Sequence, residues 1–349
     1  MEETTQTHAL LDLMTSPAFC VRDNQITAVN PAARGMLFRS GMEIASLLHT
    51  GKDEYASFSG GCLYLTLDVE GQYFGATVSR LGSEDVFLLD EIPDASLRAM
   101  SLAAMELRNP LSSLMIAVDR LDIQDEGQRQ QLAHITRSIQ QLQRIIGNMS
   151  DAGQAPGTSR MEMGDFTALF RELMDKAQVL LSHKDLTLTC QIPSEPALGL
   201  MDRDLLERAM WNMLSNALKF TPAGGKLHAS LTRQDKLLVS HLQDSGSGIA
   251  EGLMGNLFHR YQRCPGIEDS RFGLGLGMVI IRNAATQHGG TVLIDQPDAV
   301  GTRVTLTLPL RQSGSNLLRS PRVDYAGEQD HSLLELSECL PAELYRKDK

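Results

Sequence analysis

Apolar residues recur along this chain with different spacings, and each spacing predicts a different kind of element. Between residues 97 and 149 they repeat every three and four positions, the heptad pattern of helices that pack along one seam. Before this region, short apolar runs alternate with turn residues. After it, such runs alternate with longer helical patterns. The patterning therefore predicts a multidomain α+β protein.

The heptad region, within residues 93–152, contains two helices joined by a short polar connection. The break at residues 124–130 contains Gly127 and separates two apolar seams, formed by Leu97, Met100, Ala104, Leu107, Leu111, Leu114, Val118 and Leu121, and by Leu132, Ile135, Ile139, Leu142, Ile146 and Met149. Such helices form an antiparallel hairpin. Because one hairpin leaves much of its apolar stripe in water, we expect a homodimer with a four-helix bundle. Packing of the seam on the chain's own domains is the alternative.

Residues 1–92 are expected to form a small sensor unit. Its apolar runs predict an antiparallel sheet with helices on one side, with strands at 18–21, 26–29, 63–69, 73–78 and 86–89. The strand at 63–69 alternates in polarity and should be half-buried. The order strand, turn, strand and then a helix at 32–38, entered through VNPAA at 29–33, resembles a PAS sensor domain. A generic small α+β domain is the alternative.

Residues 160–311 mix helical and strand patterns, which predicts an α/β sandwich. The expected helices are 166–181, 203–218 and 277–288, and the expected strands are 186–192, 226–232, 237–242, 291–294 and 302–308. A Gly/Pro/Ser-rich linker at 151–159 precedes this unit. Residues 312–349 are polar and broken by glycine and proline, so we expect a flexible tail with a short helix near 333–340.

Composition narrows the functional classes. The chain has 349 residues and a net charge of -11, which disfavours binding to nucleic acid or to anionic lipid. Its 5 cysteines are odd in number and lack CxxC spacing, so neither a disulfide framework nor a zinc site is expected. The N-terminus does not resemble a signal peptide, and no run reaches the roughly 18 apolar residues of a membrane span. We therefore expect a cytoplasmic protein without a membrane span.

One helix and one strand end in residues 160–311 carry polar groups suited to a nucleotide. Asn212, Asn216 and Lys219 lie on one helix face, where amide oxygens suit Mg²⁺ and the lysine suits a phosphate oxygen. Asp244 follows a strand and opens the sequence DSGSG. Its carboxylate can accept a hydrogen bond from an exocyclic amine such as that of adenine, and Gly246 and Gly248 allow close approach of a ligand.

A glycine-rich segment supplies the third part of this candidate site. Gly273, Gly275 and Gly277 lead directly into a predicted helix. Backbone N–H groups at a helix N-terminus, together with the positive end of its dipole, favour phosphate. Gly301-Thr302 before the last strand is a weaker, fourth signal.

In this order the segments resemble the N, G1, F and G2 boxes of the ATP-binding domain of sensor histidine kinases, with residues 257–261 as the F box. The resemblance implies a Bergerat-type fold that binds Mg²⁺ and ATP. It places Asn216 on the metal, Asp244 on adenine, and Asn212 and Lys219 toward the phosphates. The glycines of the third segment would anchor a short lid at 260–272, and Thr302 would support the adenine pocket. Hydrolytic relatives carry a glutamate at the Asn212 position, and an amide cannot replace it as a base.

The first heptad helix resembles the phosphoacceptor box of the same family, except at the acceptor itself. Residues 105–111 read MELRNPL, with Met105 where the family has histidine. A thioether has no ring nitrogen that could attack the γ-phosphate. Met105 follows seam residue Ala104, so we expect it to face outward.

Three hypotheses stay open at this point. The chain is a degenerate kinase that binds ATP without phosphorylating itself here, or His134 on the second helix accepts the phosphate, or the chain acts as a phosphatase or adaptor toward a response regulator. In the family, Glu106 would polarise the histidine and a polar residue at Asn109 would orient a hydrolytic water. A nucleotide-gated interaction module is the alternative from another class. The expected partners are a second copy, a response regulator, and an unidentified small-molecule or protein signal at the PAS-like unit.

Overall fold

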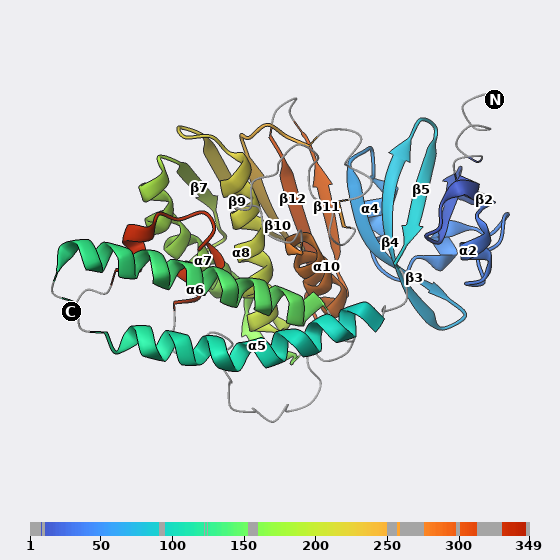
Figure 1. Cartoon of the computed structure of the whole chain (residues 1–349). Helices are drawn as coiled ribbons and strands as arrows, with labels where there is room; N and C mark the ends of the chain where they lie inside the picture. The colour runs from blue at the N-terminus through green and yellow to red at the C-terminus, as the bar shows by residue number, and fades with distance from the viewer. Residues whose placement is uncertain are drawn as a thin grey trace.

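The computed structural model describes residues 8, 11–90, 95–121, 123, 125–152, 160–249, 257–258, 276–297, 301–312 and 330–346. Figure 1 shows two groups of strands side by side and a long helical hairpin that runs beneath them. Within the described part of the chain, no helix combines the length and the apolarity needed to cross a membrane.

The N-terminal unit is a five-stranded antiparallel sheet in the order β2-β1-β5-β4-β3. The predicted strands are confirmed as β1 (Ala18–Arg22), β2 (Gln25–Val29), β3 (Cys62–Val69), β4 (Gln72–Leu81) and β5 (Glu84–Leu89). Three short helices follow β2, namely α2 (Pro31–Arg34), α3 (Ile44–Leu47) and α4 (Lys52–Ala56). The helix expected at 32–38 is shorter because it ends at Arg34. The side chain of Asn30 caps it by accepting the N–H of Ala33 at 2.9 Å.

The hairpin consists of α5 (Ala95–Asp119) and α6 (Glu126–Ala152), so the connection is shorter than the polar break suggested. Five of the predicted seam residues are buried between the two helices, namely Ala104, Leu111, Val118, Ile139 and Ile146. Five others are 49–54% exposed, namely Leu107, Leu114, Leu121, Ile135 and Leu142. A single chain therefore covers only one side of the apolar stripe.

The third unit has the predicted sheet of β7 (Thr187–Gln191), β9 (Lys226–Gln234), β10 (Leu237–Asp244), β11 (Thr291–Asp295) and β12 (Arg303–Pro309). The three predicted helices pack against it as α7 (Phe166–Leu181), α8 (Arg203–Phe220) and α10 (Gly277–His288). A small second sheet pairs β6 (Glu162–Asp165) with β8 (Leu198–Met201). The sequence did not predict this pair, because each strand has four residues and contains a glycine at its centre.

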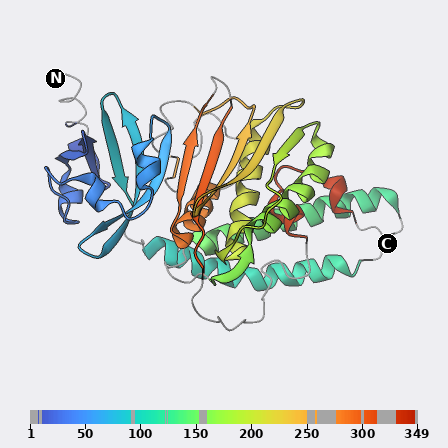
Figure 2. The same ribbon diagram turned by 180° about the vertical axis from the view of Figure 1, so that it is seen from behind.

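The two sheets join edge to edge into one ten-stranded sheet. β3 pairs antiparallel with β11, which places Leu63 opposite Leu293, and both opposite views show the two sets of strands side by side (Figures 1 and 2). The expectation that β3 is half-buried is therefore wrong. Seven of its eight residues are buried, because β3 lies in the interior of the combined sheet and not at an edge.

A polar network reinforces this junction. Arg282 of α10 donates to Asp90 at 2.7 Å, and Asp90 also accepts the hydroxyl of Tyr64 in β3 at 2.6 Å. The Arg282 guanidinium lies 5.2 Å from the centre of the Tyr64 ring. The N-terminal unit is thus tied to a helix that borders the candidate nucleotide site.

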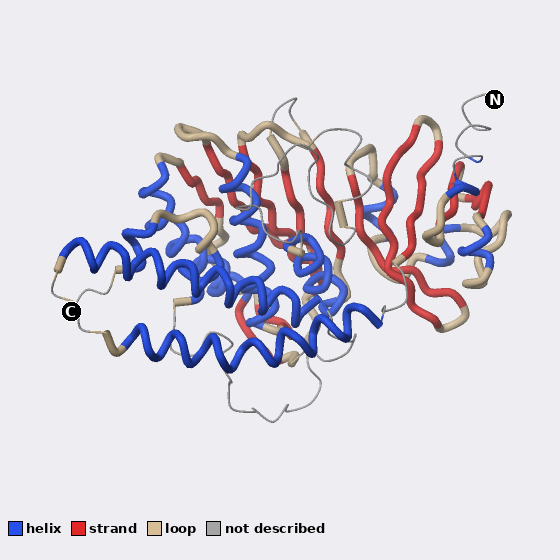
Figure 3. The backbone as a smooth tube through the Cα atoms, viewed as in Figure 1, coloured by secondary structure: helices blue, strands red, loops and turns tan. Residues whose placement is uncertain are grey.

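The C-terminal residues depart from the expectation of a flexible tail. Residues 330–346, called here the C-terminal segment, form α11 (His331–Glu335) and the 3-10 helix η3 (Ala342–Tyr345). The segment packs against α6 and α8, with Leu334, Leu336 and Leu340 buried. Figure 3 shows it as short helical turns beside the long hairpin helix. The helix expected at 333–340 is displaced toward the N-terminus and ends at Glu335.

Candidate functional site

Helix α8 carries the first group of predicted site residues and is fixed at its N-terminus. The Asp202 side chain caps the helix by accepting the N–H of Leu205 at 3.1 Å. The Asp202 N–H in turn donates to Nε2 of His288 at the end of α10, at 3.0 Å. On the next turns of α8, Asn212 is buried, whereas Asn216 and Lys219 are partly exposed. The cap and the histidine thus set the axial position of these side chains.

The amide oxygens of α8 converge on the first residue of α10. A Cβ atom added to Gly277 would lie 3.1 Å from Oδ1 of Asn212 and 3.7 Å from Oδ1 of Asn216. Glycine therefore lets the N-terminus of α10 lie close against two amide carbonyl oxygens. Hard oxygen donors suit Mg²⁺, and helix N-terminal N–H groups suit phosphate. The chemistry of this donor set fits a magnesium nucleotide.

Two predicted parts of the site lie outside the described residues. These are Gly273 and Gly275, together with the lid at 260–272. Of the F box only Leu257 and Phe258 are described. The Phe258 side chain is fully buried, and the backbone carbonyl of Phe258 accepts a hydrogen bond from Nη1 of Arg282 at 3.3 Å.

Asp244 lies at the end of β10, and its carboxylate is held by neighbouring backbone. Oδ1 accepts the N–H of Gly246 at 2.8 Å and that of Thr302 at 3.2 Å. Burial raises the pKa of Asp244 above its ordinary value, and the two N–H donors act in the opposite direction. Among the described residues Oδ2 has no hydrogen-bond partner, so this oxygen can accept a donor from a ligand.

Glycines let the backbone close around Asp244. Gly301 has φ +92°, and a Cβ added there would lie 2.1 Å from the Asp244 carbonyl oxygen. Gly248 has φ +73°, with the Gln296 side chain 2.1 Å from its added Cβ position. Larger residues would therefore push Thr302 and Asp244 apart.

The hairpin contributes an arginine to this site, which the sequence did not predict. Nη2 of Arg144, on α6, donates to Oδ1 of Asn212 at 3.2 Å. Nearby, Arg208 of α8 donates to Oδ1 of Asn148 at 3.1 Å and forms an ion pair with Asp151. Polar side chains of α6 and α8 thus meet between the two helices. These contacts join residues about 60 positions apart, so no local pattern signals them.

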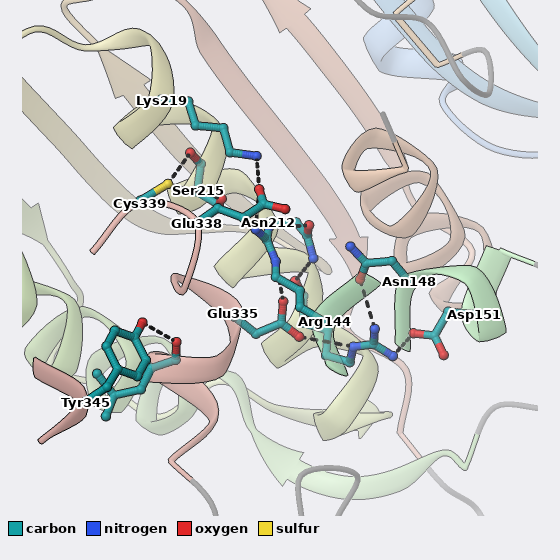
Figure 4. A network of polar contacts seen from close by, with 12 residues as sticks. Arg144, Asn148, Asp151, Asn212, Ser215, Lys219, Glu335, Glu338, Cys339 and Tyr345 are labelled. Carbon is teal, nitrogen blue, oxygen red and sulfur yellow. Dashed lines mark hydrogen bonds and ion pairs between the residues drawn. The ribbon is translucent and has the colours of Figure 1, made fainter. Parts of the chain in front are cut away.

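Two carboxylates of the C-terminal segment complete the cluster (Figure 4). Glu338 forms ion pairs with Lys219 and, at 2.9 Å, with Arg144. Glu335 pairs with Arg144 at 3.2 Å and with Arg208 at 3.4 Å. Burial alone would raise the pKa of Glu338, but the cations of Arg144 and Lys219 outweigh it and hold that pKa below its ordinary value.

Met105, at the position where the sequence predicts the phosphoacceptor, faces away from the hairpin core. The Met105 side chain is 57% exposed, and Glu106 and Asn109 are exposed as well, so the outward orientation is confirmed. The hydroxyl of Ser101 donates to the Ser150 carbonyl at 3.4 Å, which sets the antiparallel register. On this register exposed His134 lies a little more than three helical turns, or ~18 Å, along the hairpin from Met105.

Two segments of the chain match known protein families. Residues 98–156 match the His Kinase A (phospho-acceptor) domain family. Residues 201–312 match the family of histidine kinase-, DNA gyrase B-, and HSP90-like ATPases. The chain belongs to the sensor histidine kinase family. The two matches cover the hairpin and the unit that holds Asn216 and Asp244.

Individual histidine kinases resemble this chain over the same region. Hybrid signal transduction histidine kinase D of Dictyostelium discoideum is 29% identical over 241 residues, which are 64% of this chain and 15% of the relative. Adaptive-response sensory kinase SasA of Rippkaea orientalis is 28% identical over 228 residues, or 60% of this chain and 57% of the relative. The chain thus spans only 15% of the length of the first relative and 57% of the length of the second.

A solved histidine kinase structure shares the fold. Full-length ShkA in complex with AMPPNP superposes with a TM-score of 0.51 at 19% identity, covering 62% of this chain and 47% of that one. At this identity the similarity shows a common fold for the kinase units.

Proposed function

We propose that this chain is a cytoplasmic two-component signalling protein that binds Mg²⁺ and ATP and acts in a phosphorelay. The observation that carries the proposal is the convergence of the Asn212 and Asn216 oxygens on the N-terminus of α10 at Gly277. The domains would be a PAS-like sensor at 1–92, a dimerisation hairpin at 93–152 and an ATP-binding unit at 160–311. The five-stranded antiparallel sheet, with three short helices between β2 and β3, supports the PAS-like assignment.

In this proposal each side chain has a distinct task. Asn216 holds Mg²⁺, which neutralises phosphate charge when bound, and Asn212 and Lys219 face the phosphates. Asp244 accepts the exocyclic amine of adenine, and the Thr302 N–H keeps its carboxylate oriented. The glycines at 246, 248, 273, 275 and 277 allow the backbone to approach the nucleotide.

Autophosphorylation at the usual position is doubtful because the Met105 sulfur cannot form the phosphoramidate that an imidazole forms. The test is incubation of the full chain with Mg²⁺ and γ-labelled ATP. We expect nucleotide binding without acid-labile label on the wild type. Label on Met105→His would indicate that only the acceptor was lost. Label on the wild type that disappears in His134→Ala would instead assign the acceptor to His134.

A second candidate function is that of a response-regulator phosphatase or a nucleotide-gated adaptor. Glu106 and Asn109 are exposed one turn apart on α5, where they can face a docked partner. Asn109 would orient a water toward a phospho-aspartate, and this chemistry needs no imidazole. The test is the decay of a phosphorylated response regulator with the wild type and with Asn109→Ala. An equal decay rate with both proteins excludes the phosphatase and leaves the adaptor.

The hairpin supports a homodimer. Its exposed seam residues, including Leu107, Leu114 and Leu142, repeat at seven-residue intervals along α5 and α6. An exposed apolar stripe of this kind is the face that a second hairpin would cover in a four-helix bundle. The signal at the PAS-like unit would be a small molecule or a protein.

A further inference from the structure

The C-terminal segment occupies groups that the proposed function assigns to the nucleotide. The Glu338 carboxylate pairs with Lys219, the proposed phosphate ligand, and with Arg144. Arg144 in turn donates a hydrogen bond to Oδ1 of Asn212. Asn212 is the second residue that the proposed function places toward the phosphates. Figure 4 shows these side chains pointing toward one another from α6, α8 and the segment.

The C-terminal segment supplies carboxylates to the cations of this interface. Glu338 pairs with Arg144 and Lys219, and Glu335 pairs with Arg144 and Arg208. Without the segment, Arg144 and Lys219 would lose these ion pairs. Cations that lose their partners in a partly buried site favour a replacement anion. A phosphate chain carries the charge and the oxygen acceptors that such a site requires.

Apolar and backbone contacts hold the segment independently of Glu338. Leu336 and Leu340 are buried in the same core as α8, and the Tyr345 hydroxyl donates to the Leu333 carbonyl at 2.8 Å. Nε of Arg137 on α6 donates to the Ser337 carbonyl at 2.9 Å. These contacts place the Glu338 carboxylate in a defined position. Docking of the C-terminal segment alone would not require the buried carboxylate of Glu338 beside Arg144 and Lys219.

We propose that Arg144 and Lys219 form one anion site, which Glu338 and the phosphates of the nucleotide occupy in turn. The C-terminal segment is then an internal competitor of Mg²⁺-ATP. Arg144 is a phosphate-binding residue that the hairpin contributes. The inference rests on the proposed nucleotide site and adds both its regulation and a further ligand residue.

The test uses the full chain and calorimetric titration with Mg²⁺-ATP, Mg²⁺-ADP and adenosine. Glu338→Gln keeps the shape of the side chain and removes its charge. We expect this variant to bind Mg²⁺-ATP at least about tenfold more tightly than the wild type, with unchanged affinity for adenosine, which has no phosphate. Glu343→Gln is the matched control, because Glu343 lies on the same segment but is exposed. It should bind like the wild type.

A double variant separates a phosphate ligand from a structural contact. If Arg144 binds phosphate, Arg144→Gln combined with Glu338→Gln binds Mg²⁺-ATP more weakly than Glu338→Gln alone. If Arg144 only anchors the segment, the double variant binds as tightly or more tightly, and its assignment as a ligand is overturned. Equal ATP affinity of wild type and Glu338→Gln overturns the competition while leaving the nucleotide site intact. Absence of binding by every variant refutes the proposed function itself, and this inference with it.

Discussion

Replacement of Glu335 by leucine should release the C-terminal segment. Glu335 is fully buried, and its two oxygens pair with Arg144 and Arg208. Leucine has a similar size but removes the charge. The guanidinium groups of Arg144 and Arg208 would then stay in the interface without their ion pairs to Glu335. Burial of a cation that has lost an ion pair costs free energy, so the chain can lower its free energy by undocking the segment.

The expected magnitude follows from the burial of the pair. Breaking a buried ion pair by removal of one partner costs about 3–5 kcal/mol. The segment is short, and each of its few buried apolar side chains contributes about 1.5–3 kcal/mol to docking. Because the segment also loses chain entropy on docking, a loss of 3–5 kcal/mol is enough to leave it mostly undocked.

Hydrogen exchange and chemical denaturation measure this effect. In Glu335→Leu, amides of residues 332–346 should exchange much faster, while amides of β10 and β12 keep their protection. The control is Glu126→Gln, which removes an exposed ion pair with Arg346 and should cost about 0–1 kcal/mol. Unchanged protection of residues 332–346 in Glu335→Leu would refute the view that buried charge pairing holds the segment.

Three further predictions concern other parts of the chain. Leu114→Glu should convert a dimer into a monomer by light scattering, and a stable dimer in this variant would contradict the hairpin interface. Gly277→Val should abolish Mg²⁺-ATP binding with little change in the circular dichroism spectrum, because its side chain would crowd two amide oxygens. Unchanged affinity would show that the contact of α10 with these oxygens is not needed for nucleotide binding. Burial lowers the pKa of His288, against the opposing hydrogen bond to the Ala284 carbonyl. The unfolded chain therefore takes up this proton first, so stability should be highest above a pH of about 6.5, fall below it, and level off below the native pKa. His288→Gln should reduce this pH dependence in thermal unfolding. An identical pH profile in the variant would contradict the assignment of this pH dependence to His288.

The sequence predicted the parts of the fold that depend on local periodicity. Helices α7 and α10 have the predicted bounds, and the heptad phase placed Met105 outside the hairpin core, as observed. The order of polar boxes also indicated that Asn212, Asn216 and Gly277 approach one another, although they lie more than sixty residues apart.

The remaining features depend on contacts that no local pattern encodes. The pairing of β3 with β11 requires two sheet edges to meet, and an alternating strand does not reveal which edge it will join. Residues 312–349 are broken by Gly314, Pro321 and Gly327, so this whole region resembled a mobile tail, although the C-terminal segment within it is rich in leucine. The segment is ordered because α6 and α8 supply both an apolar surface and the cations that Glu335 and Glu338 need.

The most direct measurement is isothermal titration of the full chain with Mg²⁺-ATP, performed on the wild type and on Glu338→Gln. We expect one nucleotide per chain, tighter binding by the variant, and loss of binding when Asn216→Ala or Asp244→Asn is introduced into a chain that remains folded. If neither the wild type nor Glu338→Gln releases or absorbs heat with the nucleotide, the convergence of these residues does not form a nucleotide site.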